Sequence, residues 1–468
     1  MIAKRTFTMT DQEAFARWSG DRNPIHMDPV VARRSLAGAP VVHGMHLLLW
    51  ALNEALDDPA FQFPTRVRAE FRKFLLVGQP VSLNRLEGRA GQVIWKLFSG
   101  DGAVATIRFG APENDRDDWT AASLPEVGEE LQEPTLDQMR QLSGLLQLRA
   151  REIASSFPRV ASRLSEQTLS ALARLSGLVG MACPGLHSIL AGVDVDLWPE
   201  AVDQRALGFR STKVDERYRL VRMQVRGPGL QGCVEAFVRP EPIEALNISK
   251  AAELVSCDHF ADRRALVIGG SRGIGAVTAK LLVAGGADVT VTYASGSADA
   301  ASICKEVAAH GQGTCRAITL DVCQDVATPL AALDAQPTHI YYFATPRIFL
   351  QKRPEFDRKV FDRFVDFYVA GFDAICRYFS AAAEPLHIFY PSSVAVTDRP
   401  AGLTEYAMAK AAGELLCADL MRLHPNLHIV AERLPRILTD QTATVQQVPG
   451  ERPESLMLPL LTRSDSPI

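Results

Sequence analysis

The sequence has no apolar run of about 18 residues, the length that a membrane-spanning helix needs. Its first residues, MIAKRTFTMTDQEAF, lack the apolar core of a signal peptide, so we expect a cytoplasmic protein. It also lacks an excess of charge of either sign. Because 50 basic residues stand against 54 acidic ones, nothing points to a nucleic-acid or membrane partner. The expected partners are therefore small molecules or a carrier protein.

Cysteine pairs of the C-x-x-C type are absent as well. The eight cysteines are scattered along the chain. This pattern argues against zinc sites, metal clusters and a disulfide framework. We therefore predict no bound metal, and we expect most cysteines to be small buried hydrophobic residues.

The length of the chain indicates several globular domains. A sequence of 468 residues exceeds one ordinary core, and a mean hydropathy of +0.01 fits a globular protein without large disordered regions. One boundary is the stretch 111–134, which is acidic and rich in turn-forming residues. The other is 239–264, which separates strand-like runs from alternating strand and helix patterns. The domains that we expect span residues 1–112, 135–245 and 262–445.

The first two domains contain an internal repeat. Each has a helical stretch ending in a Ser-Gly pair, Ser19-Gly20 or Ser176-Gly177, then an apolar segment with histidine and several strand-like runs. The last strand-like runs of the two domains, DGAVATIRFGAPEN and GLQGCVEAFVRPEP, match best. A chance likeness of apolar segments is the alternative. After residue 264 strand and helix patterns alternate, which predicts a parallel sheet wrapped by helices.

The stretch FARWSGDRNPIHMDP gathers an acid, an amide and an imidazole together with two prolines. Asp21, Asn23 and His26 follow a short amphipathic helix. Pro24 and Pro29 are expected to keep the segment extended, so that the polar side chains can converge over a cleft. The alternative, which we favour for any one of these residues alone, is a turn-capping aspartate and a histidine in a polar pocket.

A long apolar helix is expected directly after this stretch. Residues 38–56, GAPVVHGMHLLLWALNEAL, turn through Gly44 into an apolar pattern that strands could enclose. The first turn of a helix has backbone N–H groups without intrahelical partners, which suit a thioester oxygen that gains charge.

These segments resemble the MaoC-like, (R)-specific enoyl-CoA hydratase family of hot-dog proteins. Its pattern is Gly-Asp-x-Asn-Pro-Ile/Leu-His-x-Asp-Pro followed by Val-His-Gly-Met. The sequence meets it from Gly20 to Pro29 and from Val42 to Met45.

The resemblance implies a catalytic dyad. Asp21 and His26 would hold one water for addition to, or loss from, a 3-hydroxyacyl thioester, with Asn23 orienting it. The backbone N–H of Gly44 would polarise the thioester carbonyl. Removing a proton next to a thioester and expelling hydroxide requires both a base and an acid.

The second copy departs from this pattern. LSGLVGMACPGLHSIL runs from the Ser-Gly pair straight into an expected apolar helix, without the Asp-x-Asn-Pro-x-His segment. It therefore cannot supply a second dyad, and His187 is expected to be structural. Double hot-dog hydratases with one working half are known in the family, and this copy would complete such a pair.

The third domain contains a glycine turn, ALVIGGSRGIGAVTAKLL, in which a strand runs into Gly269, Gly273 and Gly275 and then into a helix. Such a turn lets the backbone approach a pyrophosphate at the helix N-terminus. The predicted cofactor-binding residues are Gly269, Ser271, Arg272, Gly273, Ile274, Gly275, Ser295, Asp321, Val322, Tyr406 and Lys410.

Three further residues join the glycine turn. Ser393 in FYPSSVAV precedes Tyr406 and Lys410 in EYAMAK. Over residues 262–440 the sequence resembles the short-chain dehydrogenase/reductase family. The resemblance implies that Tyr406 passes a proton to a carbonyl oxygen, that Lys410 lowers the pKa of this tyrosine and binds the nicotinamide ribose, and that Ser393 binds the same oxygen. For Tyr406 and Lys410 alone, an exposed helix pair would be the default reading.

The expected cofactor is NADPH rather than NADH. The end of the second strand, VTVTYASGS, has no acidic residue for a ribose 2'-hydroxyl, whereas Arg272 and Ser295 could accept a 2'-phosphate.

The sequence departs from the reductase family at three places, which bear on turnover more than on cofactor binding. Residues 342–345 are Tyr-Phe-Ala-Thr where Asn-Asn-Ala-Gly is usual. Tyr368 lies near the position of the asparagine in the family's proton relay, and Arg436 stands where Pro-Gly is usual.

The expected fold is an α+β double hot-dog module followed by an α/β Rossmann domain with a doubly wound parallel sheet. The expected function is bifunctional, because reduction of a 3-oxoacyl thioester gives the 3-hydroxyacyl thioester that the hot-dog module would dehydrate. In the alternatives, the reductase domain acts on an unrelated carbonyl or only binds nucleotide as a sensor. The sequence leaves open whether the carrier is coenzyme A or acyl carrier protein. It also leaves open the acyl chain length, the direction of the reaction and whether the chain forms a homodimer.

Overall fold

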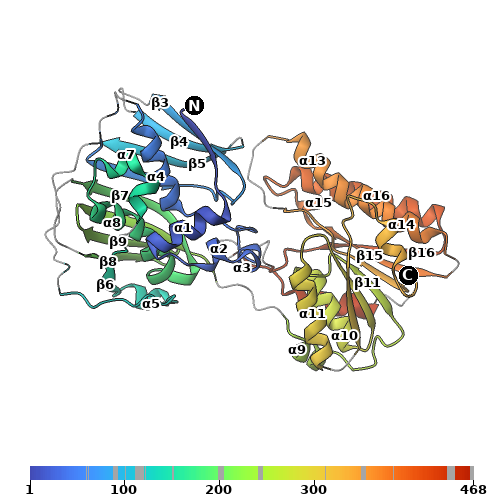
Figure 1. Cartoon of the computed structure of the whole chain (residues 1–468). Coiled ribbons are helices and arrows are strands. Elements are labelled where there is room, and N and C mark those ends of the chain that lie inside the picture. Colours follow the sequence, from blue (N-terminus) through green and yellow to red (C-terminus); the bar gives the residue numbers. More distant parts are fainter. Residues whose placement is uncertain are drawn as a thin grey trace. The chain divides into compact units, whose positions relative to one another are not determined.

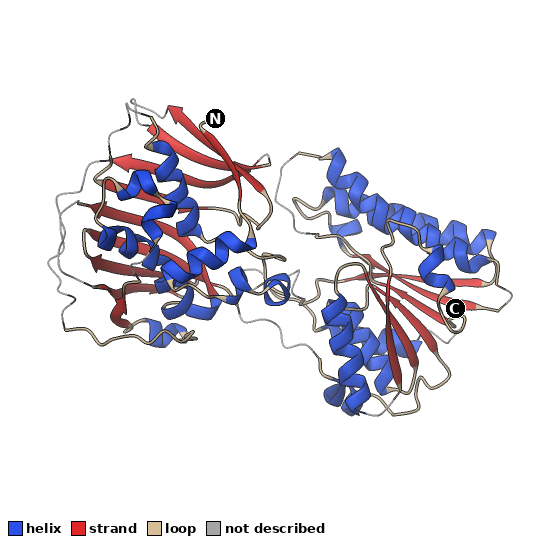
Figure 2. Ribbon diagram, viewed as in Figure 1, coloured by secondary structure: helices blue, strands red, loops and turns tan. Residues whose placement is uncertain are grey.

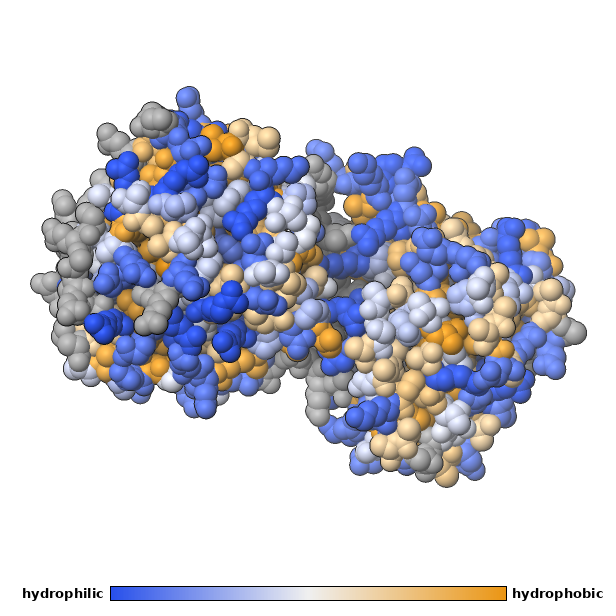
Figure 3. All heavy atoms as spheres, viewed as in Figure 1, coloured by the Kyte–Doolittle hydropathy of each residue, from blue (hydrophilic) through white to orange (hydrophobic). Residues whose placement is uncertain are grey.

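The computed structural model consists of two compact units (Figure 1), formed mainly by Met1–Glu241 and by Pro242–Ala443 with Val448–Ile468. The residues that it describes are 1–58, 61, 63–87, 93–100, 102–110, 121, 123–149, 152–198, 205–240, 246–310, 313–348, 355–382, 384–439 and 448–463. Among these residues, no helix combines the length and the apolar character that crossing a membrane requires. On the face that Figure 3 shows, hydrophilic and apolar side chains are interspersed on both units.

The first unit is built on one ten-stranded sheet whose neighbouring strands are all antiparallel. Its strands are β1 (Ala3–Thr6), β2 (Arg66–Phe71), β3 (Pro80–Glu87), β4 (Val93–Ser99), β5 (Gly102–Gly110), β6 (Ser143–Gln147), β7 (Ser188–Leu197), β8 (Ala206–Asp215), β9 (Leu220–Gly227) and β10 (Leu230–Val238). They follow the order β1-β3-β4-β5-β2-β7-β10-β9-β8-β6. This is a hot-dog-like antiparallel sheet.

The strand order repeats about the centre of this sheet. Strands β1-β3-β4-β5-β2 on one side correspond to β6-β8-β9-β10-β7 on the other, and β2 pairs with β7 in the middle. The two sequence runs that match best contain β5 and β10, which occupy equivalent positions in the strand order.

Helices cover one face of this sheet (Figure 2). They are α1 (Met9–Ser19), α2 (Pro24–Met27), α3 (Pro29–Arg33), α4 (Gly44–Ala55), α5 (Leu136–Met139), α6 (Ile153–Ser156), α7 (Pro158–Ala161) and α8 (Glu166–Gly177), with a π-helical turn η2 (Leu178–Ala182) and a 3-10 turn η3 (Gly185–His187). Helices α4 and α8 pack against each other in the core. Nearly every side chain of α4 is buried, as expected for a helix that is apolar all round.

The chain around Pro24 and Pro29 is helical, in contrast to the extended segment that we predicted. Each proline is the first residue of a short helix, α2 or α3, and the side chains of Asn23 and Asp28 cap these helices. Proline suits this position because its fixed φ angle is helical and its missing N–H would have no intrahelical partner. The prediction of an extended segment was therefore wrong.

The apolar helix expected after Ser176-Gly177 does not extend beyond Ala182. Helix α8 continues through this pair into η2, and the segment then forms η3 and strand β7. Pro184 follows η2 and cannot continue a helix, because it lacks the backbone N–H, and residues 188–190 at the end of the expected helix already belong to β7. Consequently α8, rather than a later helix, holds the place in the second half that α4 holds in the first.

The second unit contains the parallel sheet that the sequence predicts. Its strands are β11 (Arg264–Ile268), β12 (Asp288–Tyr293), β13 (Thr314–Thr319), β14 (His339–Tyr342), β15 (Leu386–Ser393) and β16 (Leu427–Leu434). All neighbours are parallel in the order β13-β12-β11-β14-β15-β16. The order reverses between β11 and β14, where doubly wound sheets bind their ligands.

Helices cover both faces of this sheet (Figure 2). They are α9 (Ile248–Leu254), α10 (Gly273–Ala284), α11 (Ser297–His310), α12 (Ala327–Ala331), α13 (Arg358–Val365), α14 (Gly371–Ser380), α15 (Ala395–Asp398), α16 (Thr404–Leu423) and α17 (Pro453–Arg463), with a π-helical turn η4 (Asp366–Ala370). One core lies under α9, α10, α11 and α17, and another lies under α14 and α16. The Rossmann fold expected for this part of the chain is thus confirmed.

Candidate active sites

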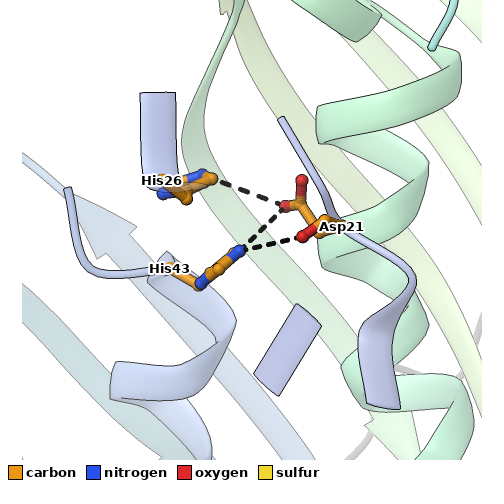
Figure 4. A group of neighbouring side chains, drawn as sticks. All are labelled: Asp21, His26 and His43. Atoms are coloured by element: carbon orange, nitrogen blue, oxygen red, sulfur yellow. Dashed lines mark hydrogen bonds and ion pairs between the residues drawn. The ribbon is translucent and has the colours of Figure 1, made fainter. Parts of the chain in front are cut away.

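Asp21 and His26 meet in the first unit (Figure 4). Asp21 follows α1, which ends at Gly20 in the left-handed conformation, and its carboxylate is buried. The His26 Nδ1 atom lies 2.7 Å from the carbonyl oxygen of Val41, so it carries the proton that is donated there. In the neutral ring the Nε2 atom holds a lone pair, and it lies 3.9 Å from Asp21 Oδ2. Two groups at this separation can both contact one water molecule.

A second histidine, His43, belongs to the same cluster, and our sequence analysis gave it no role. It precedes α4, and its ring stacks on that of His26 with centroids 3.9 Å apart. Its Nδ1 faces Gln12 Oε1 at 2.9 Å, and its Nε2 faces the Asp21 carbonyl oxygen at 3.2 Å. Burial and the neighbouring His26 hold the pKa of His43 well below its usual value. The ring is therefore neutral and has one proton for these two acceptors.

The side chains of Asp21, His26 and His43 place three possible metal-ligand atoms within 4.8 Å of one another. An ion bound by two imidazoles has to lie in the plane of both rings. The rings of His26 and His43 are stacked at 24°, so their planes do not intersect near the Nε2 atoms. This arrangement suits proton transfer better than metal binding.

The second half of the sheet completes this site through α8 and η2. Ser176 Oγ donates a 2.7 Å hydrogen bond to Asp21 Oδ2. At Gly180, a Cβ atom would lie 2.1 Å from Asp21 Oδ1, and at Gly177 it would lie 2.3 Å from the carbonyl oxygen of Ser19. These glycines leave the room that the loop requires. The Ser-Gly pair was visible in the sequence, but no local signal connects it with an aspartate 155 residues away.

Asn23 fastens the same loop to the second half. Its Nδ2 donates to the carbonyl oxygens of Gly180, Gly185 and Leu186, at 2.8, 3.1 and 3.2 Å. Its Oδ1 accepts a hydrogen bond from the backbone N–H of Ile25. Both ends of this amide are therefore engaged with the protein, whereas the family resemblance implied that Asn23 orients a water.

The structure also shows what surrounds two other predicted residues, Gly44 and His187. Gly44 is the first residue of α4, and a Cβ there would lie 2.8 Å from a methyl group of Leu190 and 3.3 Å from the ring of Phe71. A glycine thus lets the helix N-terminus approach β2 and β7. His187 bonds to Glu133 Oε1 through Nε2 at 2.6 Å, which agrees with a structural role.

In the second unit the glycine turn joins β11 to α10. Gly269 and Gly273 have positive φ angles of 74° and 57°, and a Cβ at Gly275 would lie 2.4 Å from the Gly269 carbonyl oxygen. Only glycine meets these demands without strain. The other predicted residues lie at the same edge of the sheet, in the turn (Ser271, Arg272), at the start of α10 (Ile274), after β12 (Ser295) and after β13 (Asp321, Val322).

Ser393, Tyr406 and Lys410 also come together in this unit. Ser393 ends β15, and the other two lie one turn apart on α16. Burial raises the pKa of Tyr406, and a hydrogen bond with Ser393 offsets part of this rise. The Lys410 Nζ donates a 2.5 Å hydrogen bond to the Pro391 carbonyl oxygen, and burial lowers the pKa of this lysine to about 7.

Two of the three departures from the reductase pattern are neighbours in space. The Tyr368 hydroxyl, on η4, lies 2.5 Å from Thr345 Oγ1, after β14. The ring of Tyr368 faces the Lys410 ammonium group at 3.8 Å from its centroid.

Comparisons with known proteins match each unit separately. A family model described as MaoC like domain matches residues 2–82, and one described as short chain dehydrogenase matches residues 263–445. A search of curated proteins gave no match.

Several solved structures resemble the chain. A 3-oxoacyl-[acyl-carrier protein] reductase from Brucella melitensis is 22% identical over 48% of this chain and 92% of its own, with a TM-score of 0.40. A 3-oxoacyl (acyl-carrier-protein) reductase from Agrobacterium tumefaciens with NADP bound is 20% identical over 44% and 88%, with a TM-score of 0.40. A short chain dehydrogenase from Burkholderia cenocepacia in complex with NADP is 23% identical over 43% and 90%, with a TM-score of 0.36.

Proposed function

This chain joins a MaoC-like domain to a short-chain dehydrogenase domain, and we propose that it is a bifunctional enzyme of 3-hydroxyacyl thioester metabolism. It combines an (R)-3-hydroxyacyl dehydratase, or enoyl hydratase, with an NADPH-dependent 3-oxoacyl reductase. The observation that carries the proposal is the buried Asp21 carboxylate facing the Nε2 of His26, whose Nδ1 donates to the Val41 carbonyl oxygen.

In the dehydratase site the two groups share the proton transfers. For hydration, one group takes a proton from a water molecule while the oxygen of this water bonds to the β-carbon of the enoyl thioester. The other group delivers a proton to the α-carbon, and dehydration reverses both steps. The N-terminus of α4 at Gly44 stabilises the charge that develops on the thioester oxygen. Ser176 and the backbone N–H of Asn23 hold the carboxylate in place.

The second half serves as a degenerate hot-dog domain in this proposal. Residues 1–112 form the working copy and residues 135–245 the second copy, and the mirrored strand order about β2 and β7 supports this division. The second copy lacks a dyad, but it contributes Ser176 and the acceptors for Asn23.

Changing Ser176 to alanine is expected to lower the kcat of crotonyl-CoA hydration about tenfold with little change in KM, because the carboxylate loses a charge-assisted hydrogen bond. Ser170→Ala is the matched control, since Ser170 is also buried on α8 and its hydroxyl has no hydrogen-bond partner among the described residues. Equal rates for the two variants would contradict a role of the second half in the site.

The residues of the second unit fit NADPH. Gly269, Gly273 and Gly275 carry no side chain where β11 turns into α10, so the backbone there can approach a pyrophosphate at the helix N-terminus. When bound, the cofactor supplies a hydride to the carbonyl carbon. Tyr406 donates a proton to the carbonyl oxygen, Ser393 donates a hydrogen bond to it, and the Lys410 charge assists Tyr406.

Changing Arg272 to alanine should weaken NADPH binding about tenfold or more while NADH binding changes little, because a guanidinium group at the 2'-phosphate makes a charge-assisted contact. Titration of the fluorescence of both nucleotides measures this. Arg264→Ala, at the opposite end of β11, is the control. An equal loss for both nucleotides would place Arg272 elsewhere on the cofactor.

The two activities act in succession on one substrate. The full chain is expected to consume NADPH in the presence of acetoacetyl-CoA and to convert part of the product to crotonyl-CoA, which absorbance and mass spectrometry would detect. The second candidate is a reductase domain that acts on an unrelated carbonyl or only binds nucleotide. Tyr368 and Thr345, which replace the usual residues, favour this candidate. NADPH binding without consumption of any 3-oxoacyl thioester would select it.

A further inference from the structure

An aromatic face covers the buried ammonium group of Lys410. The Nζ atom lies 3.8 Å from the ring centroid of Tyr368 and 4.9 Å from that of Tyr390. The lysine side chain is buried, and its hydrogen bond to Pro391 leaves two further N–H groups on the ammonium. Contacts with ring faces therefore form a large part of its surroundings.

The ring of Tyr368 is held firmly in this position. It is fully buried, its hydroxyl bonds to Thr345, and the ring of Phe364 stacks on it at 5.7 Å and 7°. Tyr406 meets it edge-on at 5.7 Å. The ring that faces Lys410 thus also contacts the tyrosine that acts as the proton donor in the proposed reduction.

The backbone of η4 is fixed by two other tyrosines. The hydroxyl of Tyr390 donates to the Tyr368 carbonyl oxygen at 3.0 Å, and that of Tyr342 donates to the Phe367 carbonyl oxygen at 2.6 Å. A π-helical turn leaves such carbonyl groups outside the regular helical pattern. These hydrogen bonds set the position from which Tyr368 projects.

The face of an aromatic ring carries partial negative charge, so it stabilises an ammonium ion and not a neutral amine. Burial acts in the opposite direction and lowers the pKa of Lys410 to about 7, although Cys417 and Glu414 on the same helix oppose this shift. The ammonium form is present below this value and is lost as the pH rises through it. Without the ring of Tyr368, the charge would be lost at a still lower pH.

We propose that Tyr368 is a positioning residue of the reductase site, which holds Lys410 in its charged form beside Tyr406 through its ring face and not through its hydroxyl. The inference rests on the proposed function only for the role of Lys410. The contact between the Lys410 ammonium group and the Tyr368 ring does not depend on that function.

The charge of Lys410 can be followed without turnover. In the full chain with 13C at the ε-carbon of its ten lysines, NMR gives the pH midpoint of each, and Lys410→Arg identifies the signal of Lys410. Tyr368→Leu should lower that midpoint by about 0.5–1 pH unit, the size expected for a cation–π contact. Tyr368→Phe keeps the ring face and should leave the midpoint unchanged.

Phe361→Leu is the matched control, because it removes a ring that packs on the same cluster and makes its ring contact with Phe356. It should not move the midpoint. An unchanged midpoint in Tyr368→Leu, or equal shifts in Tyr368→Leu and Tyr368→Phe, would overturn the proposal.

The rate of NADPH consumption with acetoacetyl-CoA gives a second readout. The alkaline limb of its pH profile should move to lower pH in Tyr368→Leu by the same amount as the NMR midpoint, and Tyr368→Phe should follow the wild type. If the wild-type chain consumes no NADPH, the proposed function fails, and the NMR midpoints still decide the role of Tyr368.

Discussion

Changing His26 to alanine should lower the rate of crotonyl-CoA hydration by about a hundredfold to ten-thousandfold, the usual value of a general acid–base group. The reason is the geometry of the ring. Its Nδ1 is committed to the Val41 carbonyl oxygen, so the Nε2 that faces Asp21 is the atom that can exchange a proton with water. The loss of absorbance of the enoyl thioester measures the rate.

His43 cannot replace His26 in this variant. It is completely buried, and its single proton is shared between Gln12 and the Asp21 backbone. His187→Ala is the control, because that ring bonds to Glu133 in the second half. Asp21→Asn should cause a loss similar to that of His26→Ala. Wild-type rates in both dyad variants, with an unchanged circular dichroism spectrum, would refute the site.

Changing Tyr406 to phenylalanine should reduce 3-oxoacyl thioester reduction by about a hundredfold to ten-thousandfold while NADPH still binds. Phenylalanine keeps the ring that packs edge-on against Phe364 and Tyr368, but it has no proton to transfer. NADPH consumption and NADPH fluorescence titration would be measured on the same preparation.

Tyr378→Phe provides the control for this substitution, because Tyr378 is exposed on α14. Failure of the wild-type chain to bind NADPH would refute the cofactor. Retained reduction in Tyr406→Phe would show that another group donates the proton.

The sequence predicts those parts of the sites that are local in the chain. Asp21 and His26 lie five residues apart, and Tyr406 and Lys410 lie four apart, so a motif can contain them. The glycine turn is equally local, because the positive φ angles at Gly269 and Gly273 are a property of the backbone there.

The parts that depend on packing between distant segments were not predictable. Ser176 and Gly180 reach Asp21 only because α8 packs beside α1 and α4. His43 lay inside a recognised motif, but its stacking on His26 depends on the path of the chain between the two rings. Around Pro24, the capping side chain of Asn23 decided the local structure, and our reading of proline as a helix breaker overlooked it.

The pairing of β2 with β7 bears on how the first unit folds. Their register joins Arg66 with Asp196 and Glu70 with Gly192, across more than a hundred residues of intervening chain. Until β7 is in place, β2 has a free edge with unpaired N–H and C=O groups, and such an edge invites pairing with another chain. Closing so long a loop is slow, because its entropy is lost before the contacts form. The ten strands therefore gain their stability together, and the first half on its own would be prone to aggregation.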